Sequence, residues 1–184
     1  MSKNKHKNFH STTILCLRDD KKVVIIGDGQ VSLGDTVIKN TANKIRTLND
    51  GNILTGFAGA TADAFTLFNK LEEKLRKHSN NLIKSSIELT KDWRMNTYLR
   101  KLESMIIVAD RKSTLILSGN GDILEPEDGI AAIGSGGNYA LAAAKALINI
   151  SSMDLEEKAK KSMQIASNIC IYTNQYTFIK KIIM

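Results

Sequence analysis

Two adjacent threonines, Thr12 and Thr13, stand between a short polar tail and an apolar run at residues 14–17 that predicts a β-strand. If the chain is cut between Ser11 and Thr12, Thr12 gains a free α-amine beside its hydroxyl. A hydroxyl is a poor nucleophile without an adjacent base, and a threonine can use its own terminal amine as that base. Such an amine titrates at roughly 7.7–8.0, which suits proton transfer near neutral pH. Taken alone, the Thr-Thr pair indicates only β-propensity.

A carboxylate and a lysine follow at positions where they can support such a site. Asp28 lies in Gly-Asp-Gly-Gln, directly after a second apolar run at residues 23–26, and the glycines permit a tight turn there. Lys44 lies in a third predicted strand, residues 43–48, where alternation puts Lys44 and Arg46 on one face. A buried lysine is costly unless it is paired, and Asp28 is the candidate partner. Each of these residues alone is more typical of a turn or a solvated surface than of a catalytic site.

Several motifs, in this order, resemble the HslV (ClpQ) family of bacterial proteasome-like threonine peptidases. They are Thr12-Thr13-Ile14, Gly27-Asp28-Gly29-Gln30, Lys44, residues 56–68, Lys91-Asp92-Trp93-Arg94, Gly119-Asn120-Gly121-Asp122 and residues 133–137. The resemblance extends from Thr12 nearly to the C-terminus. It implies an α+β fold, the four-layer αββα sandwich of N-terminal nucleophile hydrolases, as in proteasome β-subunits. It also implies a propeptide, residues 1–11, removed by autolysis, and a single peptidase domain, residues 12–184.

The resemblance assigns roles to five residues. Thr12 is implied to be the nucleophile and, through its amine, the base. Lys44 matches the lysine whose positive charge lowers the pKa of that amine, and Asp28 matches the carboxylate that positions Lys44. Ser135 matches a serine that hydrogen-bonds near the amine. The backbone N–H of Gly56 is expected to donate to the developing oxyanion.

The implied activity is that of a threonine-type endopeptidase acting on unfolded or misfolded proteins. The expected assembly is a homododecamer of two stacked six-membered rings, activated allosterically by a hexameric ATPase, HslU (ClpY). The motif GxxxxGK[ST] occurs nowhere in the sequence, so ATP is expected to be used by the partner and not by this chain.

Two features of the resemblance concern the ends of the chain. Many relatives carry only an initiator methionine, or a longer tail ending in glycine, whereas this tail ends in Phe-His-Ser and has to be removed by self-cleavage. The family also binds a monovalent cation, expected here to be sodium, through backbone carbonyls that map to Ser167, Cys170 and Thr173. Position 167 is often glycine in relatives, which carbonyl ligation tolerates. The simpler interpretation is a helix C-terminus with hydrated carbonyls.

Composition favours one cytoplasmic domain, because 184 residues with 42% hydrophobic content can bury a sizeable core. No apolar stretch approaches the length of a membrane span, so no membrane association is expected. Cys16 and Cys170 have no zinc-binding spacing and fit a reducing compartment. The net charge is +7, of which the tail supplies three lysines, and the remaining cations are mixed with carboxylates. Nucleic acid is therefore not an expected partner.

The periodicity predicts strands, two helices, strands, two helices and a closing strand, an α+β order. The first helix pair is expected over residues 61–78 and 80–102. Core positions expected on it are Phe65, Phe68, Leu71, Leu75, Leu82, Ile83, Ile87 and Trp93. Strands are expected at 105–109 and 114–118, followed by a tight turn at Asn120-Gly121. A helix follows Gly136-Gly137 to about residue 150, and another starts near Ser151, capped with Asp154.

Two other functions remain open from the sequence. An N-terminal threonine amidohydrolase would use the same nucleophile on small amides. A noncatalytic anion-binding assembly protein would keep residues 1–11 and bind polyanions with a steep salt dependence. The glycines at residues 134–137 precede a predicted helix and could cradle a phosphate, but they lack a Rossmann fingerprint. A Ser-His-Asp triad is not expected, because His6 and His10 lie in the tail and His78 at a charged helix end.

Overall fold

The computed structural model describes residues 9–10, 12–59, 61–97, 99 and 104–184. The strands are β1 (Phe9–His10), β2 (Thr13–Arg18), β3 (Lys22–Asp28), β4 (Val31–Leu33), β5 (Thr36–Lys39), β6 (Ile45–Leu48), β7 (Ile53–Ala58), β8 (Met105–Ala109), β9 (Thr114–Ser118), β10 (Ile123–Leu124), β11 (Ile130–Gly134) and β12 (Thr177–Ile183). The helices are α1 (Thr61–Lys77), α2 (Leu82–Met95), α3 (Gly137–Leu147) and α4 (Leu155–Ile169).

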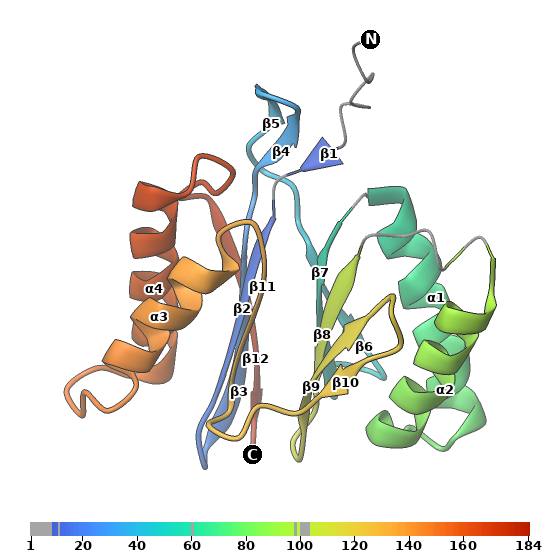
Figure 1. Cartoon of the computed structure of the whole chain (residues 1–184). Coiled ribbons are helices and arrows are strands. Elements are labelled where there is room, and N and C mark those ends of the chain that lie inside the picture. Colours follow the sequence, from blue (N-terminus) through green and yellow to red (C-terminus); the bar gives the residue numbers. More distant parts are fainter. Residues whose placement is uncertain (1–8, 11, 60, 98, 100–103) are drawn as a thin grey trace, which may run out of the picture.

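Two antiparallel sheets pack face to face between two helix pairs, which confirms the predicted αββα sandwich (Figure 1). One sheet has the strand order β11-β2-β3-β12, and α3 and α4 cover its outer face. The other has the order β10-β9-β8-β7-β6 and is covered by α1 and α2. A small third sheet, β1-β4-β5, extends beyond the sandwich at one end.

The sequence of β2 and β3 explains why both faces of their sheet are covered. These strands are runs of consecutive apolar residues, with no polar residue alternating between them, and every position from Thr13 to Leu17 and from Val23 to Asp28 is buried. A continuous apolar run is the pattern of a strand buried on both faces. Ile14 and Ile25 face the second sheet, whereas Leu15 and Ile26 face α3 and α4.

The strand register brings several chain segments to one end of the sandwich. Gly134, at the end of β11, lies opposite Thr13, at the start of β2. Thr177, at the start of β12, lies opposite Asp28, at the end of β3. The third sheet rises from this same end in Figure 1, where β4 and β5 follow β3. The residues predicted to do chemistry therefore collect at one edge.

Helix α2 differs from its predicted form. It ends at Met95 and not at residue 102, because Asn96 leaves the helical conformation with ψ 120°. Ile83 and Ile87, predicted to be core, are 48% and 38% exposed, and Phe65 on α1 is exposed as well. The buried face of α2 carries Leu82, Ser85, Ser86, Leu89, Thr90 and Trp93. Two serines thus take core positions that the pattern assigned to isoleucines.

The N-cap of α4 lies three residues later than the cap predicted at Ser151. Asp154 is the N-cap, and its side chain accepts the Glu157 N–H while the Glu157 side chain accepts the Asp154 N–H. This reciprocal pair is a capping box. The hairpin at Asn120-Gly121 is confirmed, because β9 and β10 pair across it and Gly121 has φ +93°.

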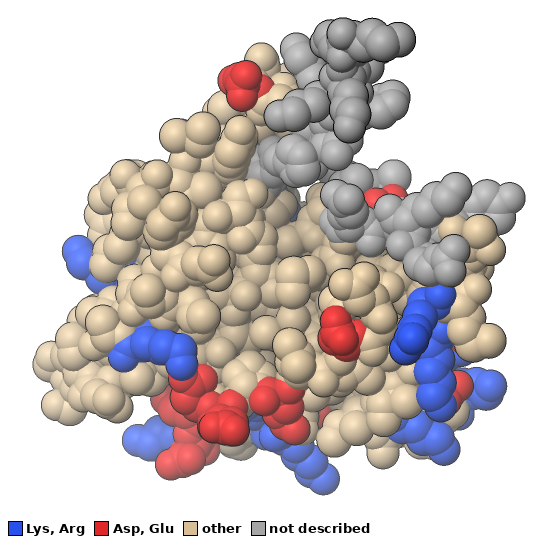
Figure 2. All heavy atoms as spheres, viewed as in Figure 1, with Lys and Arg blue, Asp and Glu red and all other residues tan. Residues whose placement is uncertain are grey.

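Charged side chains are unevenly distributed over the face drawn in Figure 2. Lys and Arg, together with Asp and Glu, gather along its lower part, at the end opposite to β4 and β5. Several charged side chains form ion pairs: Lys145 pairs with Asp128, and Lys22 and Lys181 both pair with Glu156. Within the described ranges, no helix is long and apolar enough to cross a membrane.

Candidate active site

The carboxylate of Asp28 is the centre of the candidate site. Its side chain is completely buried, and its Oδ1 atom accepts the backbone N–H of Thr13 at 2.7 Å and the ammonium of Lys44 at 2.8 Å. Its Oδ2 atom accepts the N–H of Gln30 at 3.0 Å and that of Asn174 at 3.4 Å. A buried carboxylate requires this degree of hydrogen bonding to offset its lost hydration.

Lys44 lies one position before β6, outside the observed strand, although the prediction placed it within a strand at residues 43–48. Its side chain is 10% exposed. Burial lowers the pKa of Lys44, and the negative charge of Asp28 and the hydrogen bond to it act in the opposite direction. Arg46, the other cation considered for an inward position, instead lies over the Phe65 ring at 4.4 Å. Lys44 is therefore the cation that the fold directs into the site.

Thr12 directly precedes β2 and is 6% exposed. Its carbonyl accepts the N–H of Ser135 at 2.8 Å. Gly134 makes this contact possible, because its φ is +89° and a Cβ atom there would lie 2.0 Å from the Thr12 oxygen. Only glycine fits a backbone that combines this conformation with such a close approach. The side chain of Ser135 is exposed, and the contact that brings Ser135 to Thr12 is made by its main chain.

Gly56 does not occupy the position expected of an oxyanion donor. It lies within β7, where the Phe57 N–H donates to the Lys44 carbonyl on the β6 side. Successive N–H groups of a strand point to opposite sides, so the Gly56 N–H points to β8, where Gly56 pairs with Ile107. The absence of a side chain at Gly56 is explained by Ile14, whose Cγ2 atom would lie 2.5 Å from an added Cβ. The role predicted for Gly56 is not favoured by this geometry.

The three residues expected to bind a cation lie together at the end of α4. Ser167 is in its last turn, Cys170 is its C-cap, and Thr173 donates its N–H to the Cys170 carbonyl at 3.1 Å. Carbonyls in the last turn of a helix have no intrahelical partner, and the negative end of the helix dipole favours a cation. The chemistry of this carbonyl set fits a monovalent cation. Among the described residues, no group of three or more His, Cys, Asp and Glu side chains could hold a metal ion.

The structure adds supporting residues that sequence reasoning missed. Asn174 donates its N–H to Asp28 and accepts the Gly29 N–H on its side-chain oxygen, at 3.1 Å. The Thr173 hydroxyl lies 2.7 Å from the Thr13 hydroxyl. Gln30 donates its side-chain amide to the Ile171 carbonyl at 2.9 Å. The only local signal for these contacts is the polar Thr-Asn pair in the loop after α4.

The tail residues nearest the candidate nucleophile form part of the third sheet, which was not predicted. In β1, Phe9 lies opposite Leu33 and His10 lies opposite Ser32, antiparallel to β4. Ser11, on one side of the predicted cleavage bond, and residues 1–8 lie outside the described residues. The segment before Thr12 thus approaches it as a strand along β4.

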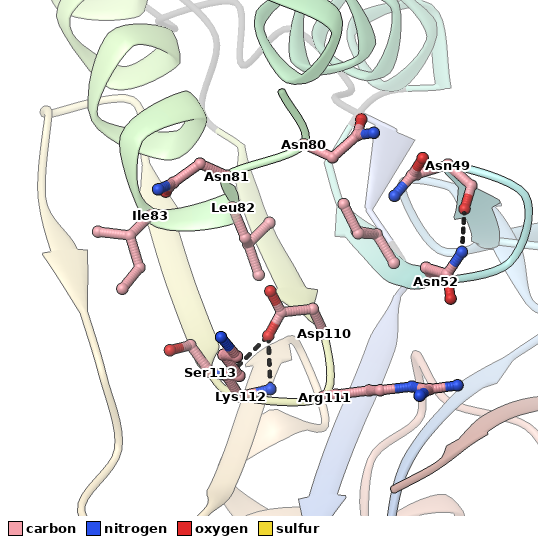
Figure 3. A pocket seen from close by; sticks show the side chains of 11 residues that line it. Asn49, Asn52, Asn80, Asn81, Leu82, Ile83, Asp110, Arg111, Lys112 and Ser113 are labelled. Atoms are coloured by element: carbon pink, nitrogen blue, oxygen red, sulfur yellow. Dashed lines mark hydrogen bonds between the residues drawn. The ribbon is translucent and has the colours of Figure 1, made fainter. Parts of the chain in front are cut away.

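A hollow lies away from this site, between the β6–β7, α1–α2 and β8–β9 turns (Figure 3). It is lined by Asn49, Asn52, Ile53, Asn80, Asn81, Leu82, Ile83, Asp110, Arg111, Lys112 and Ser113. The Asp110 carboxylate forms hydrogen bonds within its own turn, where it accepts the N–H groups of Lys112 and Ser113 at 2.7 and 2.8 Å. None of the residues predicted to be catalytic lines this hollow.

The sequence is similar to proteasome subunits over almost its whole length. A model of the family described as "Proteasome subunit" matches residues 8–182. A protein of Wolbachia sp. subsp. Brugia malayi (strain TRS), named ATP-dependent protease subunit HslV, is 61% identical over 174 residues, covering 95% of this chain and 99% of the relative. A protein of the same name from Paramagnetospirillum magneticum is also 61% identical, covering 95% and 96%.

Solved structures give the same relationship. Eukaryotic HslV from Trypanosoma brucei superposes with a TM-score of 0.90 at 44% identity, covering 94% of this chain and 99% of that one. The protein called BPH from Thiobacillus denitrificans superposes with a TM-score of 0.71 at 18% identity, covering 93% and 97%, which establishes a shared fold only.

Proposed function

The chain belongs to the proteasome subunit family, within its HslV branch of protease subunits, and from that premise we propose that it is a threonine-type endopeptidase with Thr12 as nucleophile. It acts as the proteolytic subunit of an ATP-dependent protease that degrades unfolded proteins. The observation that carries the proposal is the single Asp28 oxygen that accepts both the Thr13 N–H and the Lys44 ammonium. This arrangement keeps a positive charge beside the residue that follows Thr12.

In the proposed reaction, the Thr12 hydroxyl oxygen attacks the carbonyl carbon of the scissile peptide bond, and its proton passes to the free Thr12 amine. The ammonium of Lys44 disfavours the protonated form of that amine, so that the amine is available as base near neutral pH. The C–N bond then breaks, and the leaving amine takes the proton. Thr12 is left as an acyl ester.

Water completes the cycle: it attacks the carbonyl carbon of this ester while the Thr12 amine removes a proton from the water. The acid product leaves and the Thr12 hydroxyl is restored. For the oxyanion we propose the N–H of Gly59 as donor in place of Gly56. Strand alternation turns the Gly59 N–H to the same side as that of Phe57, the side of Lys44. Ala58, its neighbour, is 3.3 Å from a Cβ placed on Gly134, at the Thr12 carbonyl.

The same site is proposed to remove residues 1–11. Before that cut the nitrogen of Thr12 is an amide and cannot act as base, so water or Lys44 has to accept the first proton. Burial lowers the pKa of Lys44, which increases its neutral fraction. The pairing of Phe9 and His10 with β4 supports this step, because it holds the segment before Thr12 extended. Autolysis after Ser11 would release it.

The expected partner is a hexameric HslU ATPase, and the expected assembly is a dodecamer of two stacked six-membered rings. The relatives are named subunits of an ATP-dependent protease, whereas this chain has no P-loop motif. Energy for unfolding therefore enters through the partner. Light scattering of the purified protein tests this assembly. A mass of twelve subunits is expected, and the mass of a monomer would contradict the proposal.

A sodium ion is proposed at the carbonyls of Ser167, Cys170 and Thr173. When bound, it would neutralise the negative end of α4 and fix the loop that follows. Replacing sodium chloride by choline chloride at equal ionic strength is expected to lower the melting temperature. An unchanged melting temperature would oppose the proposal.

The deciding experiment compares intact masses of the wild type and Thr12→Ala, and their peptide hydrolysis with and without the ATPase. The wild type is expected to lose residues 1–11 and Thr12→Ala to keep them and to cleave no peptide. Loss of the tail from both would assign trimming to another protease. Cleavage by Thr12→Ala would overturn the role of Thr12, and degradation of unfolded protein without the ATPase would oppose the partnership.

A further inference from the structure

The hydroxyls of Thr13 and Thr173 form a buried hydrogen bond between segments 160 positions apart. The two oxygen atoms lie 2.7 Å apart, and Thr13 Oγ1 also accepts the N–H of Gly136 at 2.9 Å. Thr13 is completely buried and Thr173 is 4% exposed. Neither hydroxyl has a part in the proposed reaction. For Thr173, only the backbone carbonyl has been given a role, at the proposed sodium site.

There is no room for a side chain at Gly136 beside these two hydroxyls. A Cβ atom on Gly136 would lie 2.3 Å from Thr13 Oγ1 and 2.4 Å from Thr173 Oγ1. The glycine backbone therefore packs directly on the two bonded hydroxyls. The start of β2, the loop before α3 and the loop after α4 meet here.

After self-cleavage this contact has a mechanical consequence. Thr12 becomes a chain terminus, and terminal residues fray unless they are tied down. The Thr12 carbonyl accepts the Ser135 N–H, and the next anchors are on Thr13: Asp28 accepts its N–H, and its hydroxyl bonds the Gly136 N–H and the Thr173 hydroxyl. Side chains of adjacent strand residues point to opposite faces, so the Thr13 hydroxyl can be held without obstructing the Thr12 side chain.

We infer that Thr173 is a positioning residue, whose hydroxyl acts through Thr13 to hold the terminal nucleophile in its reactive place; this inference rests on the function proposed for Thr12. Misplacement of a reacting group by about 1 Å can cost roughly 100-fold in rate. The loop after α4 holds Asp28 as well, through the Asn174 N–H. One loop thus fixes both the nucleophile's strand and the carboxylate that binds Lys44.

The test compares Thr173→Val with Thr173→Ser in the full-length protein, processed and assembled with its ATPase. Valine keeps the shape and the backbone carbonyl but removes the hydroxyl, whereas serine keeps the hydroxyl. For a fluorogenic peptide, kcat of Thr173→Val is expected to fall roughly 10- to 100-fold with KM within about twofold of the wild type. Thr173→Ser is expected to recover most of this loss. Thr173→Ala, which adds no methyl group beside Gly136, replaces valine if the valine variant does not fold.

Thr90→Val is the matched control, because Thr90 is also buried and its hydroxyl donates only within α2, to the Ser86 and Ile87 carbonyls. It is expected to lower the melting temperature without changing kcat.

Thr13→Val and the Thr13→Val/Thr173→Val double variant complete a double-mutant cycle. The losses of kcat in the two single variants are expected to be far from additive in the double variant. Unchanged kcat in Thr173→Val, no recovery with serine, or additive losses would overturn the inference alone. An inactive wild type would overturn the proposed function together with it.

Discussion

The ammonium nitrogen of Lys44 lies 2.8 Å from Asp28 Oδ1, the oxygen that also accepts the Thr13 N–H. Asp28 is completely buried, so water and salt screen this pair far less than a surface pair. The pair joins β3 to the segment before β6, and hence one sheet to the other. It has both a structural and a chemical consequence, which different variants can separate.

Asp28→Asn is expected to remove activity and to destabilise the fold. The substitution leaves the Lys44 charge buried without its counter-ion, which typically costs about 3–5 kcal/mol of unfolding free energy. Asparagine can still accept the Thr13 N–H through its one oxygen, but its amide nitrogen then faces the Gln30 and Asn174 N–H groups, so the loss reports on the charge together with these two bonds. Urea denaturation and peptide hydrolysis measure the two effects.

The double variant Asp28→Asn/Lys44→Met separates stability from chemistry. Without Lys44, no unpaired charge remains buried, so the double variant is expected to be more stable than Asp28→Asn. It is expected to stay inactive, because the positive charge near Thr12 is gone. Recovered hydrolysis in the double variant would show that Lys44 has no chemical role.

Gly134→Ala is expected to abolish both self-processing and hydrolysis. The new Cβ atom would lie 2.0 Å from the Thr12 carbonyl oxygen, so either Thr12 or the end of β11 has to move. Gly51 provides the comparison, because its φ of +87° is nearly the same but nothing lies within 4 Å of its Cβ position. Gly51→Ala is therefore expected to lose only the unfolding free energy that a left-handed backbone conformation costs a non-glycine residue, roughly 1–2 kcal/mol.

The two glycine variants are compared by intact mass for self-processing, by peptide hydrolysis for activity and by urea denaturation for stability. Full activity is expected for Gly51→Ala. Equal activity in both variants would mean that the approach of Gly134 to Thr12 is unimportant.

Much of this architecture follows from local sequence. Continuous apolar runs predict β2, β3, β8 and β9. The runs of β2 and β3 are buried, whereas Met105 at the start of β8 is exposed and β9 is partly buried. The inner face of α2 was not predictable in this way. Ser85 and Ser86 are completely buried there, while Ile83 and Ile87 point outward, so hydrophobicity alone assigns the wrong side.

In the candidate site, too, local sequence indicates some of the residues and not others. Thr12, Asp28 and Lys44 lie in short motifs at strand ends, where the sequence indicates them. The contacts of Thr173 and Asn174 span more than 140 positions and depend on where α4 ends, which no local pattern specifies. The direction of the Gly56 N–H depends on strand register, and only the paired strands reveal it.

Cys16 provides a test of stability against pH. Burial raises the pKa of this thiol from 9.0 to about 12, and the Thr114 hydroxyl and the Arg18 charge only partly oppose the shift. The native state therefore keeps the proton at pH 10, while the unfolded state releases it. Because the unfolded state then binds fewer protons, the stability contribution of Cys16 is lost as pH rises above about 9.

Urea denaturation of the wild type and Cys16→Val at pH 8 and pH 10 measures this effect. Relative to the valine variant, the wild type is expected to lose about 1.4 kcal/mol of unfolding free energy over this interval. Other groups titrate equally in both proteins and cancel in the comparison. Parallel pH profiles would show that the thiol titrates normally in the folded state.

Arg18, at the other end of β2 from Thr13, is expected to matter for stability and not for catalysis. Its guanidinium donates to the Arg111 and Ser113 carbonyls at 3.1 and 2.7 Å, and its Nε to the Thr114 hydroxyl at 3.0 Å. These bonds tie the first sheet to the β8–β9 turn. Lysine keeps the charge but not the planar set of donors, so Arg18→Lys is expected to lose roughly 1.5–3 kcal/mol of unfolding free energy.

Arg76→Lys is the control, because Arg76 is mostly exposed and forms a surface pair with Glu72. Its melting temperature is expected to equal that of the wild type, and Arg18→Lys is expected to melt at a lower temperature. The kcat of both should match the wild type, since Arg18 acts at the end of the sandwich remote from Thr12. A drop in kcat for Arg18→Lys, measured well below its melting temperature, would mean that the far end of β2 controls the nucleophile.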